Sequence, residues 1–378
     1  MKKTISILAA LIIAFSVNAQ SKKQWSEQKA NDWYKETGWL VGANFVPSTA
    51  QNPIEMWQAS TFDPVTINRE LGYAEKIGMN SMRVFLNFLV WQENPEAYIS
   101  RIDHFLNIAR THHIKIMFIF FDDVWNPYSH LGDQGTPKPR THNAGWVQCP
   151  GYEILTNEAR HKELKPYVKS IMERFKDDER VIVWDLYNEP ENNNGFCYND
   201  DGKQPYSLKL LKSSFKWARE VNPSQPITSA AWCCDWNDSN TLSEFNKFML
   251  ENSDIITFHN YDAIEKFASK AEPLKKYNRP MMCTEYMGRT NKSIFETHLP
   301  YMKENNISAY NWGLVDGKSQ TIFPWDSWSN EYPDEPKVWL HDVFRKDGTP
   351  YSTRETDLIM ELTGKKAPAK EKKVDGVF

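Results

Sequence analysis

Short apolar segments alternate along the chain with amphipathic stretches. The apolar segments fall at residues 39–46, 79–86, 114–121, 181–187, 226–232, 255–261, 280–286 and 307–314. Each has the length of a strand, and parallel strands covered on both faces read as nearly continuous hydrophobic runs. The pattern therefore predicts eight buried strands.

The stretches between these segments carry helical spacing and helix punctuation. Asp63 suits a helix N-cap, Pro64 suits the first turn, and Gly78 suits the stop after residues with apolar positions three and four apart. Residues 164–175 and 208–218 repeat the same three-and-four spacing. Amphipathic helices are therefore predicted between most of the strands.

Strands that are mostly followed by helices predict an α/β fold with a parallel sheet closed into a (β/α)8 TIM barrel, built as a single domain. An open doubly wound sheet is the rival, but it usually has fewer strands and a glycine-rich first turn. Two long polar loops are expected, at 126–151 after the third strand and 316–336 after the eighth. Barrel active sites are built from the loops on this side.

The two ends of the chain differ in composition from the barrel. Residues 1–19 combine two early lysines, a short apolar run and Val17-Asn18-Ala19, which together predict a cleaved signal peptide and an exported protein, periplasmic or secreted. No later segment is apolar enough to span a bilayer, and no cysteine follows the cleavage site to carry a lipid. The domain prediction is 1–19 signal peptide, 20–363 barrel and 364–378 charged, lysine-rich tail.

Composition narrows the class of ligand. The net charge is only −4, so no basic field indicates nucleic acid. Fifteen Trp and sixteen Tyr exceed what a core needs, and aromatic rings can hold flat apolar ligand faces. Five cysteines leave at least one thiol free; Cys149 and Cys197, both in loop-like sequence, are the expected disulfide pair if one forms. No cysteine or histidine spacing predicts a metal, and no cofactor is expected.

Two carboxylates occupy strand ends. Glu189, in Asn188-Glu189-Pro190, follows the fourth strand, where Pro190 cannot continue the ladder. Glu285, in Thr284-Glu285-Tyr286, lies near the end of the seventh. In a closed barrel both can point into one cleft, and a carboxylate pair suits cleavage of a glycosidic bond. Two such acids about 5 Å apart repel, which raises one pKa and keeps that acid protonated near neutral pH.

The polar residues at the strand ends, taken as a set, resemble the retaining glycoside hydrolases of clan A, most closely the cellulase-type family 5. The resemblance runs over residues 38 to 360 and implies that Glu189 is the acid/base, Glu285 the nucleophile and Asn188 a ligand of the sugar 2-hydroxyl. It also implies substrate-binding roles for four further residues, namely Arg83, His259, Tyr261 and Trp312.

The chain departs from this family at the end of the third strand, where Asp122-Asp123 stand in place of a frequent histidine. Asp122 is a candidate sugar ligand; the equal alternative is that it braces the long loop that follows.

The resulting prediction is an exported retaining hydrolase of a β-linked mannan, glucan or xylan type of polysaccharide or oligosaccharide. The alternative is a carbohydrate-binding barrel without catalysis; a structural surface protein would not explain the matching polar set. The sugar, the linkage, the choice of endo or exo action and the oligomeric state stay open, although the long loops could close one end of the cleft and favour exo cleavage.

Overall fold

Eight parallel strands form the centre of the molecule. The computed structural model describes residues 23–194, 197–198, 202–233, 236–238 and 241–366. The strands are β1 (Val41–Asn44), β2 (Ser81–Phe85), β3 (Lys115–Asp122), β4 (Val181–Asn188), β5 (Ile227–Thr228), β6 (Ile256–His259), β7 (Met281–Tyr286) and β8 (Ile307–Trp312). Their order in the sheet is β5-β4-β3-β2-β1-β8-β7-β6. Each predicted strand is present, so the barrel prediction is confirmed.

The sheet closes between its two end strands. Beyond β5, Ala231 forms a parallel bridge with Phe258 of β6. The Ala231 N–H donates to Thr257 O at 3.1 Å, and the His259 N–H donates to Ala231 O at 2.9 Å. The β5 ladder is shorter than the predicted 226–232, because the chain leaves β4 after Thr228 and turns to pair with β6 instead. This switch is what completes the ring.

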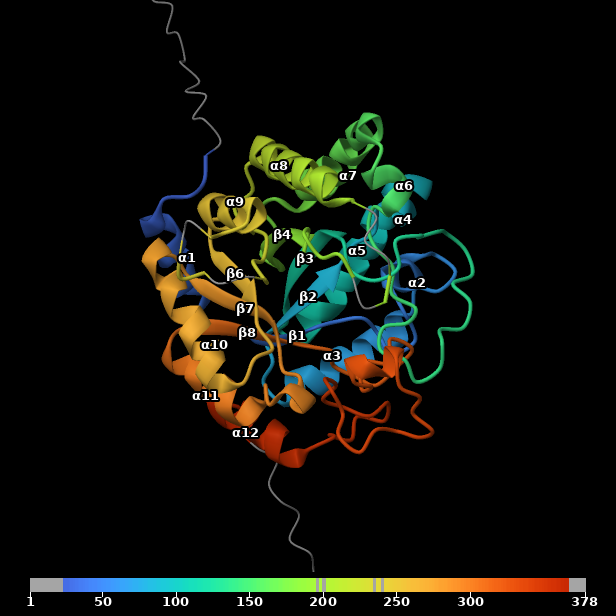
Figure 1. Ribbon diagram of the computed structural model, residues 1–378, viewed down its shortest axis with the longest axis vertical. Coiled ribbons are helices and arrows are strands. Elements are labelled where there is room, and N and C mark those ends of the chain that lie inside the picture. Colours follow the sequence, from blue (N-terminus) through green and yellow to red (C-terminus); the bar gives the residue numbers. More distant parts are fainter. Residues whose placement is uncertain (1–22, 195–196, 199–201, 234–235, 239–240, 367–378) are drawn as a thin grey trace, which may run out of the picture.

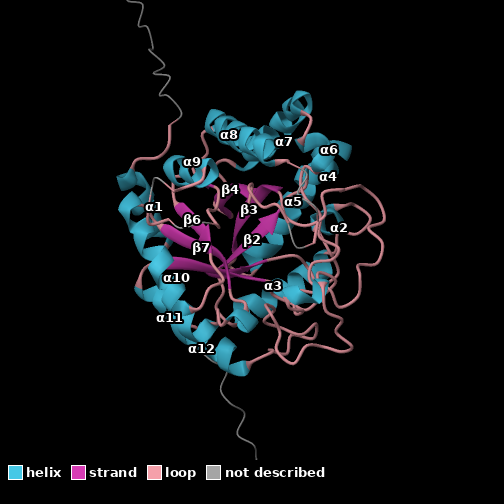
Figure 2. Cartoon of the chain, viewed as in Figure 1, coloured by secondary structure: helices cyan, strands magenta, loops and turns pink. Residues whose placement is uncertain are grey.

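Helices surround the strands (Figure 2). They are α1 (Glu27–Thr37), α2 (Pro53–Trp57), α3 (Pro64–Lys76), α4 (Phe88–Glu93), α5 (Pro95–Thr111), α6 (Tyr152–Leu155), α7 (His161–Phe175), α8 (Gln204–Val221), α9 (Glu244–Asn252), α10 (Ile264–Ala271), α11 (Phe295–Glu304) and α12 (Thr353–Thr363). Short 3-10 turns lie at η1 (Glu158–Arg160), η2 (Glu272–Tyr277), η3 (Arg289–Asn291) and η4 (Trp325–Trp328). None of the helices in the described ranges combines the length and apolar character that crossing a bilayer requires.

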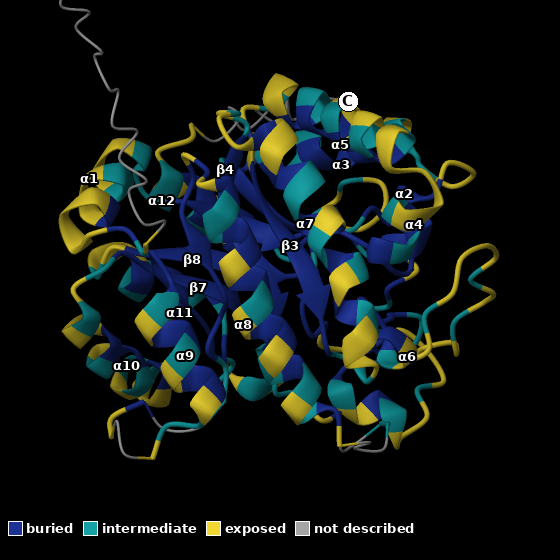
Figure 3. Cartoon of the chain, turned by 90° about the horizontal axis from the view of Figure 1, so that it is seen from above, coloured by how far each residue is buried: buried dark blue, intermediate teal, exposed yellow. Residues whose placement is uncertain are grey.

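The helix punctuation in the sequence acts as predicted. Asp63 caps α3 by accepting a hydrogen bond from the Thr66 N–H at 3.0 Å, Pro64 opens the helix, and Gly78 follows it with φ 87°. A side-chain oxygen at the N-cap satisfies a backbone donor that the first helical turn leaves unpaired. The helices turn their buried residues toward the strands and their exposed residues outward, as the dark blue centre and yellow rim of Figure 3 show.

One end of the barrel is closed by apolar side chains. Trp33 and Tyr34 of α1 pack against a cluster formed by Leu40, Met117, Ile182, Val183, Ile255, Met282 and Tyr310. Most of these residues lie in the N-terminal halves of the strands or just before them. The polar ends of β2, β4, β6 and β7 are thus left to the opposite, C-terminal mouth.

The two long loops pack together beside the mouth, on the side of α2 and α3 (Figure 1). The disulfide expected between Cys149 and Cys197 is absent, because both thiols are free. Cys149 is buried, and its sulfur accepts a hydrogen bond from the Phe88 N–H at 3.3 Å. The predicted signal peptide 1–19 and the tail beyond Lys366 lie outside the described residues.

Candidate active site

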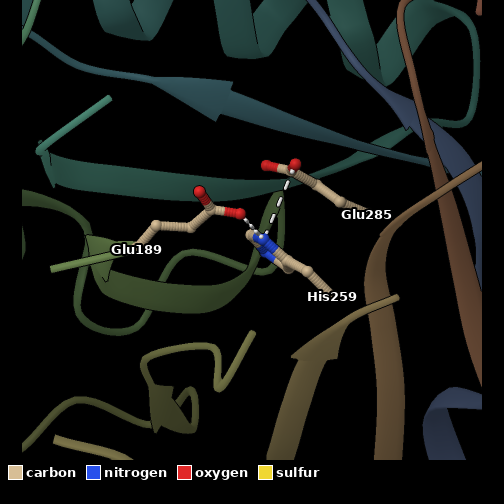
Figure 4. A group of neighbouring side chains, drawn as sticks. All are labelled: Glu189, His259 and Glu285. Atoms are coloured by element: carbon tan, nitrogen blue, oxygen red, sulfur yellow. Dashed lines mark hydrogen bonds and ion pairs between the residues drawn. The ribbon is translucent and has the colours of Figure 1, made fainter. Parts of the chain in front are cut away.

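Two glutamates and one histidine meet at the mouth of the barrel (Figure 4). Glu189 follows β4, Glu285 lies on β7, and both side chains are almost fully buried. His259, the last residue of β6, places its Nδ1 2.7 Å from Glu189 Oε1 and 3.6 Å from Glu285 Oε2. The ligand atoms of the three residues all lie within 4.8 Å of one another. The sequence-predicted pair of acids therefore shares one site.

Arg83 of β2 holds the Glu285 side of this site. Its Nη1 donates to Glu285 Oε1 at 3.0 Å and to Asn44 Oδ1 at 2.8 Å. Its Nη2 donates to Asp185 Oδ2 at 2.8 Å and to Asn188 Oδ1 at 2.7 Å. The guanidinium is fully buried, so these oxygens replace its hydration. The planar guanidinium of Arg83 thus holds the side chains of Glu285 and Asn188 in fixed positions.

Asn188 is oriented from both ends of its amide. While Oδ1 accepts from Arg83, Nδ2 donates to Asp122 Oδ1 at 3.0 Å. Asp122 also accepts from the indole N–H of Trp146 at 2.7 Å and from the Val124 N–H at 3.1 Å. Asp122 therefore braces the loop after β3 and directs Asn188, which is the geometry that the bracing alternative requires.

Tyr261 and Trp312 complete the predicted set. The Tyr261 hydroxyl donates to Glu285 Oε2 at 3.0 Å. Trp312, at the end of β8, packs edge-to-face against Phe85 at 5.7 Å and Trp146 at 5.4 Å between ring centroids. Its ring lines the same cavity as the acids. Both residues stand where a ligand over Glu285 would contact them.

The backbone at Glu189 adopts a left-handed conformation with φ 44°. A non-glycine residue in this region is uncommon and costs on the order of 1 kcal/mol or more, and such residues cluster at functional sites. The Asn192 side chain donates to Glu189 Oε2 at 2.7 Å, and the Asn192 N–H bonds Glu189 O at 2.9 Å. This turn aims the Glu189 carboxyl at His259 and into the cavity.

Burial raises the pKa of Glu189 and of Glu285 to about 7. The Arg83 cation and the Tyr261 hydroxyl contact Glu285 directly, while Glu189 accepts from the neutral Asn192 amide. Both donors to Glu285 favour its ionised form. When the pair holds one proton, that proton therefore resides on Glu189. Burial also lowers the pKa of His259 to about 4, so its ring is neutral between the acids.

The side chains of Glu189, His259 and Glu285 are close enough to bind a divalent cation, because two carboxylates and one imidazole are common metal ligands. The Arg83 guanidinium already lies 3.0 Å from Glu285 and supplies the positive charge there. The arrangement instead suits acid and nucleophile chemistry: one carboxyl protonated, one ionised, both able to reach the same atom.

A cavity of about 400 Å³ opens above the acids. The sequence-predicted residues Asp122, Asn188, Glu189, Tyr261, Glu285 and Trp312 line it, whereas the buried Arg83 and His259 do not. Loop residues that were not predicted complete its walls: Val124, Trp125, His142, Asn143, Trp146, Asn192, Trp232, Trp325 and His341. The only signal for these was the length and aromatic content of the loops, which does not say which ring faces inward.

One family model and several known proteins match parts of this chain. The model of the family described as cellulase, glycosyl hydrolase family 5, matches residues 52–318. A probable mannan endo-1,4-beta-mannosidase A of Aspergillus niger is 21% identical over 174 residues, which cover 41% of this chain and 40% of the relative. The corresponding protein of Aspergillus flavus is 26% identical over 98 residues, 25% of this chain and 22% of the relative. The chain thus spans well under half the length of these relatives.

Solved structures share the fold at low sequence identity. The endo-beta-1,4-mannanase from Thermotoga petrophila has a TM-score of 0.55 at 12% identity, covering 88% of this chain and 77% of that one. A GH5_18 protein from Streptomyces cattleya, in complex with GlcNAc, has a TM-score of 0.54 at 12% identity, covering 87% and 81%. At these identities the likeness establishes the barrel fold.

Proposed function

The chain belongs to glycosyl hydrolase family 5, and on that premise we propose that it is a retaining β-glycoside hydrolase acting by double displacement. The observation that carries the proposal is the asymmetry between two buried carboxyls in one cavity. Glu285 accepts from Arg83 and Tyr261, while Glu189 accepts from the Asn192 amide and shares a hydrogen bond with the neutral His259 ring. The pair is thereby divided into one nucleophile and one proton donor.

In the first step, protonated Glu189 gives its proton to the glycosidic oxygen while the Glu285 carboxylate attacks the anomeric carbon. The C–O bond to the leaving sugar breaks and a glycosyl ester of Glu285 forms. In the second step, ionised Glu189 takes a proton from water, whose oxygen attacks the same carbon and releases Glu285. A carboxylate oxygen of Glu189 lies within 4.8 Å of one of Glu285. This short separation favours double displacement over the inverting route, in which a water stands between acids about 6.5–9.5 Å apart.

The other predicted residues act on the sugar at this centre. Asn188 would bind its 2-hydroxyl, where a hydrogen bond strengthens as positive charge develops on the ring. The Trp312 indole offers a face to the apolar side of the pyranose. Proteins named as mannanases recur among the relatives and structural neighbours, so β-1,4-mannan is the first substrate to test, ahead of glucan and xylan types. We further propose that residues 20–363 are the catalytic domain and that 1–19 direct its export.

Azide rescue tests the two roles. Glu285→Ala mixed with an activated aryl β-glycoside and azide should yield the α-glycosyl azide, because azide replaces the missing nucleophile from the opposite face. Glu189→Ala under the same conditions should yield the β-glycosyl azide, because azide attacks the intermediate formed on Glu285. No azide product from either variant, with an active wild type, would refute the assignment. Sugar binding without any hydrolysis by the wild type would establish the carbohydrate-binding alternative.

A further inference from the structure

The loop after β3 and the loop after β8 are joined beside the mouth by hydrogen bonds, each of which involves a main-chain group of His142 or Asn143. The His142 N–H donates to Ser327 Oγ at 3.0 Å, and the Trp328 indole N–H donates to His142 O at 2.9 Å. The Asn143 N–H donates to Ser319 O at 3.0 Å. We call this contact the clasp. Because β3 and β8 are separated in the sheet by β1 and β2, the clasp spans one whole side of the mouth.

Two histidines lie at the clasp and line the cavity. His142 Nδ1 lies 2.9 Å from Phe323 O, and His341 Nδ1 lies 2.6 Å from Met287 O. A carbonyl only accepts, so each Nδ1 carries the hydrogen and each Nε2 keeps a free lone pair. The rings are 5.2 Å apart between centroids. The histidine pair therefore presents two acceptors with fixed orientation.

The Nε2 acceptor of His341 has no donor within the described ranges of the chain. His341 is completely buried, and its Nε2 has no hydrogen-bond partner among the residues that the structure describes. Burial lowers the pKa of His142 to about 3 and that of His341 well below its usual value, so both rings stay neutral. A buried acceptor left unpaired costs free energy unless a ligand supplies the donor. A hydroxyl group meets that need without adding charge.

The backbone around His341 is rigid. Arg289 donates to His341 O at 3.2 Å and to Asp342 O at 3.1 Å, and forms a double hydrogen bond to Glu355 of α12 at 2.8 and 2.6 Å. A residue held this firmly is suited to selecting one ligand geometry.

The histidine pair lies on the nucleophile's side of the cavity. The His341 ring is 5.6 Å from that of Tyr261, whose hydroxyl bonds Glu285. The side of the cavity near the acid Glu189 is formed by other segments. Asn192, which donates to Glu189, follows β4, and Trp232 follows β5. In double displacement the retained sugar sits over the nucleophile and the leaving sugar departs past the acid. The pair thus faces the retained, non-reducing sugar.

We propose that the clasp closes the non-reducing end of the cleft and that Nε2 of His142 and His341 accept hydrogen bonds from hydroxyls of the terminal sugar. The enzyme then removes sugar units from chain ends and acts on short oligosaccharides. The cavity of about 400 Å³ lies near the lower end of the range of about 300 to 1,000 Å³ for ligand-binding clefts and cavities, which suits a short ligand. This inference rests on the proposed glycosidase function.

Product analysis tests the closed end. β-1,4-linked hexaoses of mannose, glucose and xylose, each reduced at its reducing end, are digested and sampled early. We expect the substrate that is cleaved to give a free mono- or disaccharide and the matching shortened alditol in equal amounts. Internal cuts that give mainly trisaccharides, from an enzyme active on an aryl β-glycoside, overturn this inference alone. No cleavage of any hexaose or aryl glycoside overturns the glycosidase proposal with it.

Paired substitutions test the histidines. In His142→Asn and His341→Asn the amide can still donate to the backbone carbonyl, but the Nε2 acceptor is gone. In His142→Gln and His341→Gln the acceptor position is kept and the carbonyl bond is lost. We expect the Asn variants to lose roughly ten- to hundredfold in kcat/KM on the shortest cleaved oligosaccharide, with weaker inhibition by its monosaccharide, and the Gln variants to recover part of both.

The exposed His130 lies in the same loop and provides the matched control, so His130→Asn should change neither quantity. Unchanged monosaccharide inhibition and product pattern in both Asn variants would overturn the role of the pair. Thermal unfolding midpoints identify a variant that fails to fold, and the wild-type hexaose products decide the closed end regardless of it.

Discussion

At the scale of single residues, the central feature is that one proton is distributed between two acids by their neighbours. Glu285 has a cationic and a hydroxyl donor, and Glu189 has an amide and a neutral imidazole. Because burial raises both pKa values to about 7, small changes in hydrogen bonding decide which acid is ionised. The contacts of Tyr261 and Arg83 are therefore as important as the position of the acids.

Removal of the Tyr261 hydroxyl should move one limb of the pH profile. The wild type should show a bell-shaped kcat/KM profile that falls above about pH 7, where Glu189 loses its proton. Tyr261→Phe removes a donor that favours ionised Glu285, so the pKa of Glu285 rises and the acidic limb shifts to higher pH. Measured profiles with an aryl β-glycoside check this. An acidic limb that stays in place would show that the hydroxyl does not control Glu285.

Asp122 should act on the sugar through Asn188. Asp122→Ala leaves the Asn188 amide without its acceptor, and we expect a roughly ten- to hundredfold loss in kcat/KM on an aryl β-glycoside. The loss should be much smaller on the matching 2-deoxy glycoside, which lacks the hydroxyl that Asn188 would bind. Asn188→Ala and the double variant complete the cycle. Equal losses on both substrates would instead assign Asp122 to bracing the loop alone.

Residue-scale prediction from sequence succeeded where chain order fixes position. Asn188-Glu189-Pro190 and Glu285 lie at or near the ends of β4 and β7, and parallel strands bring their ends to one mouth, so their meeting followed from topology. The left-handed backbone of Glu189 and the hydrogen bonds of Asp122 to Asn188 and Trp146 depend on side-chain geometry that spacing does not encode.

At the scale of elements, the loops form the largest part of the site that the sequence did not specify. The polar composition of 126–151 and 316–336 indicated loops at the correct ends of β3 and β8, but contacts such as His142 to Ser327 join residues 185 positions apart. The cysteines show the same limit: Cys149 and Cys197 lie in neighbouring loops, yet both thiols are free. Likewise, β5 ends at Thr228 because Ala231 pairs with β6 to close the barrel. This pairing depends on the geometry of the closed sheet and not on the local sequence.

Loss of one clasp contact should loosen both loops. Ser327→Ala removes the acceptor of the buried His142 N–H, which should lower the free energy of unfolding by about 1 to 3 kcal/mol. It should also speed proteolysis within 126–151, measured as the rate of loop cleavage at native conditions. The exposed Ser329 makes Ser329→Ala a matched control, expected to leave both unchanged. Equal cleavage rates for the two variants would contradict a clasp that holds the loops.

At the scale of the whole molecule, burying charged groups at the mouth of the barrel costs free energy, and burying apolar side chains elsewhere offsets that cost. Apolar side chains close one end around Trp33 and Tyr34, whereas the other end buries two acids and the Arg83 cation. Unpaired charges in such a place are expensive, so the site is stable only while each group keeps its partner. The apolar segments that supply the stabilising burial could be predicted from the sequence. The burial of charged groups could not, because it depends on how the polar strand ends come together in the fold.

Glu189→Gln should therefore stabilise the protein at high pH while it removes the acid. Burial raises the pKa of Glu189 from 4.5 to about 7, so between these values the folded protein holds a proton that the unfolded chain releases. Wild-type stability then falls as pH rises through this window, by on the order of 3 kcal/mol for this group. A neutral glutamine has no such loss. Relative to wild type, the free energy of unfolding of Glu189→Gln should rise from pH 4.5 to 7 and then level off.

Urea unfolding at several pH values between 4.5 and 8 measures this difference. Replacing the exposed carboxyl of Glu304 by Gln is the control for removing a surface charge, and it should show no comparable rise. Ionised Glu285 also becomes less costly when residue 189 cannot be charged, which acts in the same direction. A flat difference across the window would mean that Glu189 is ionised in the folded protein at neutral pH, and the assignment of the proton donor would fail with it.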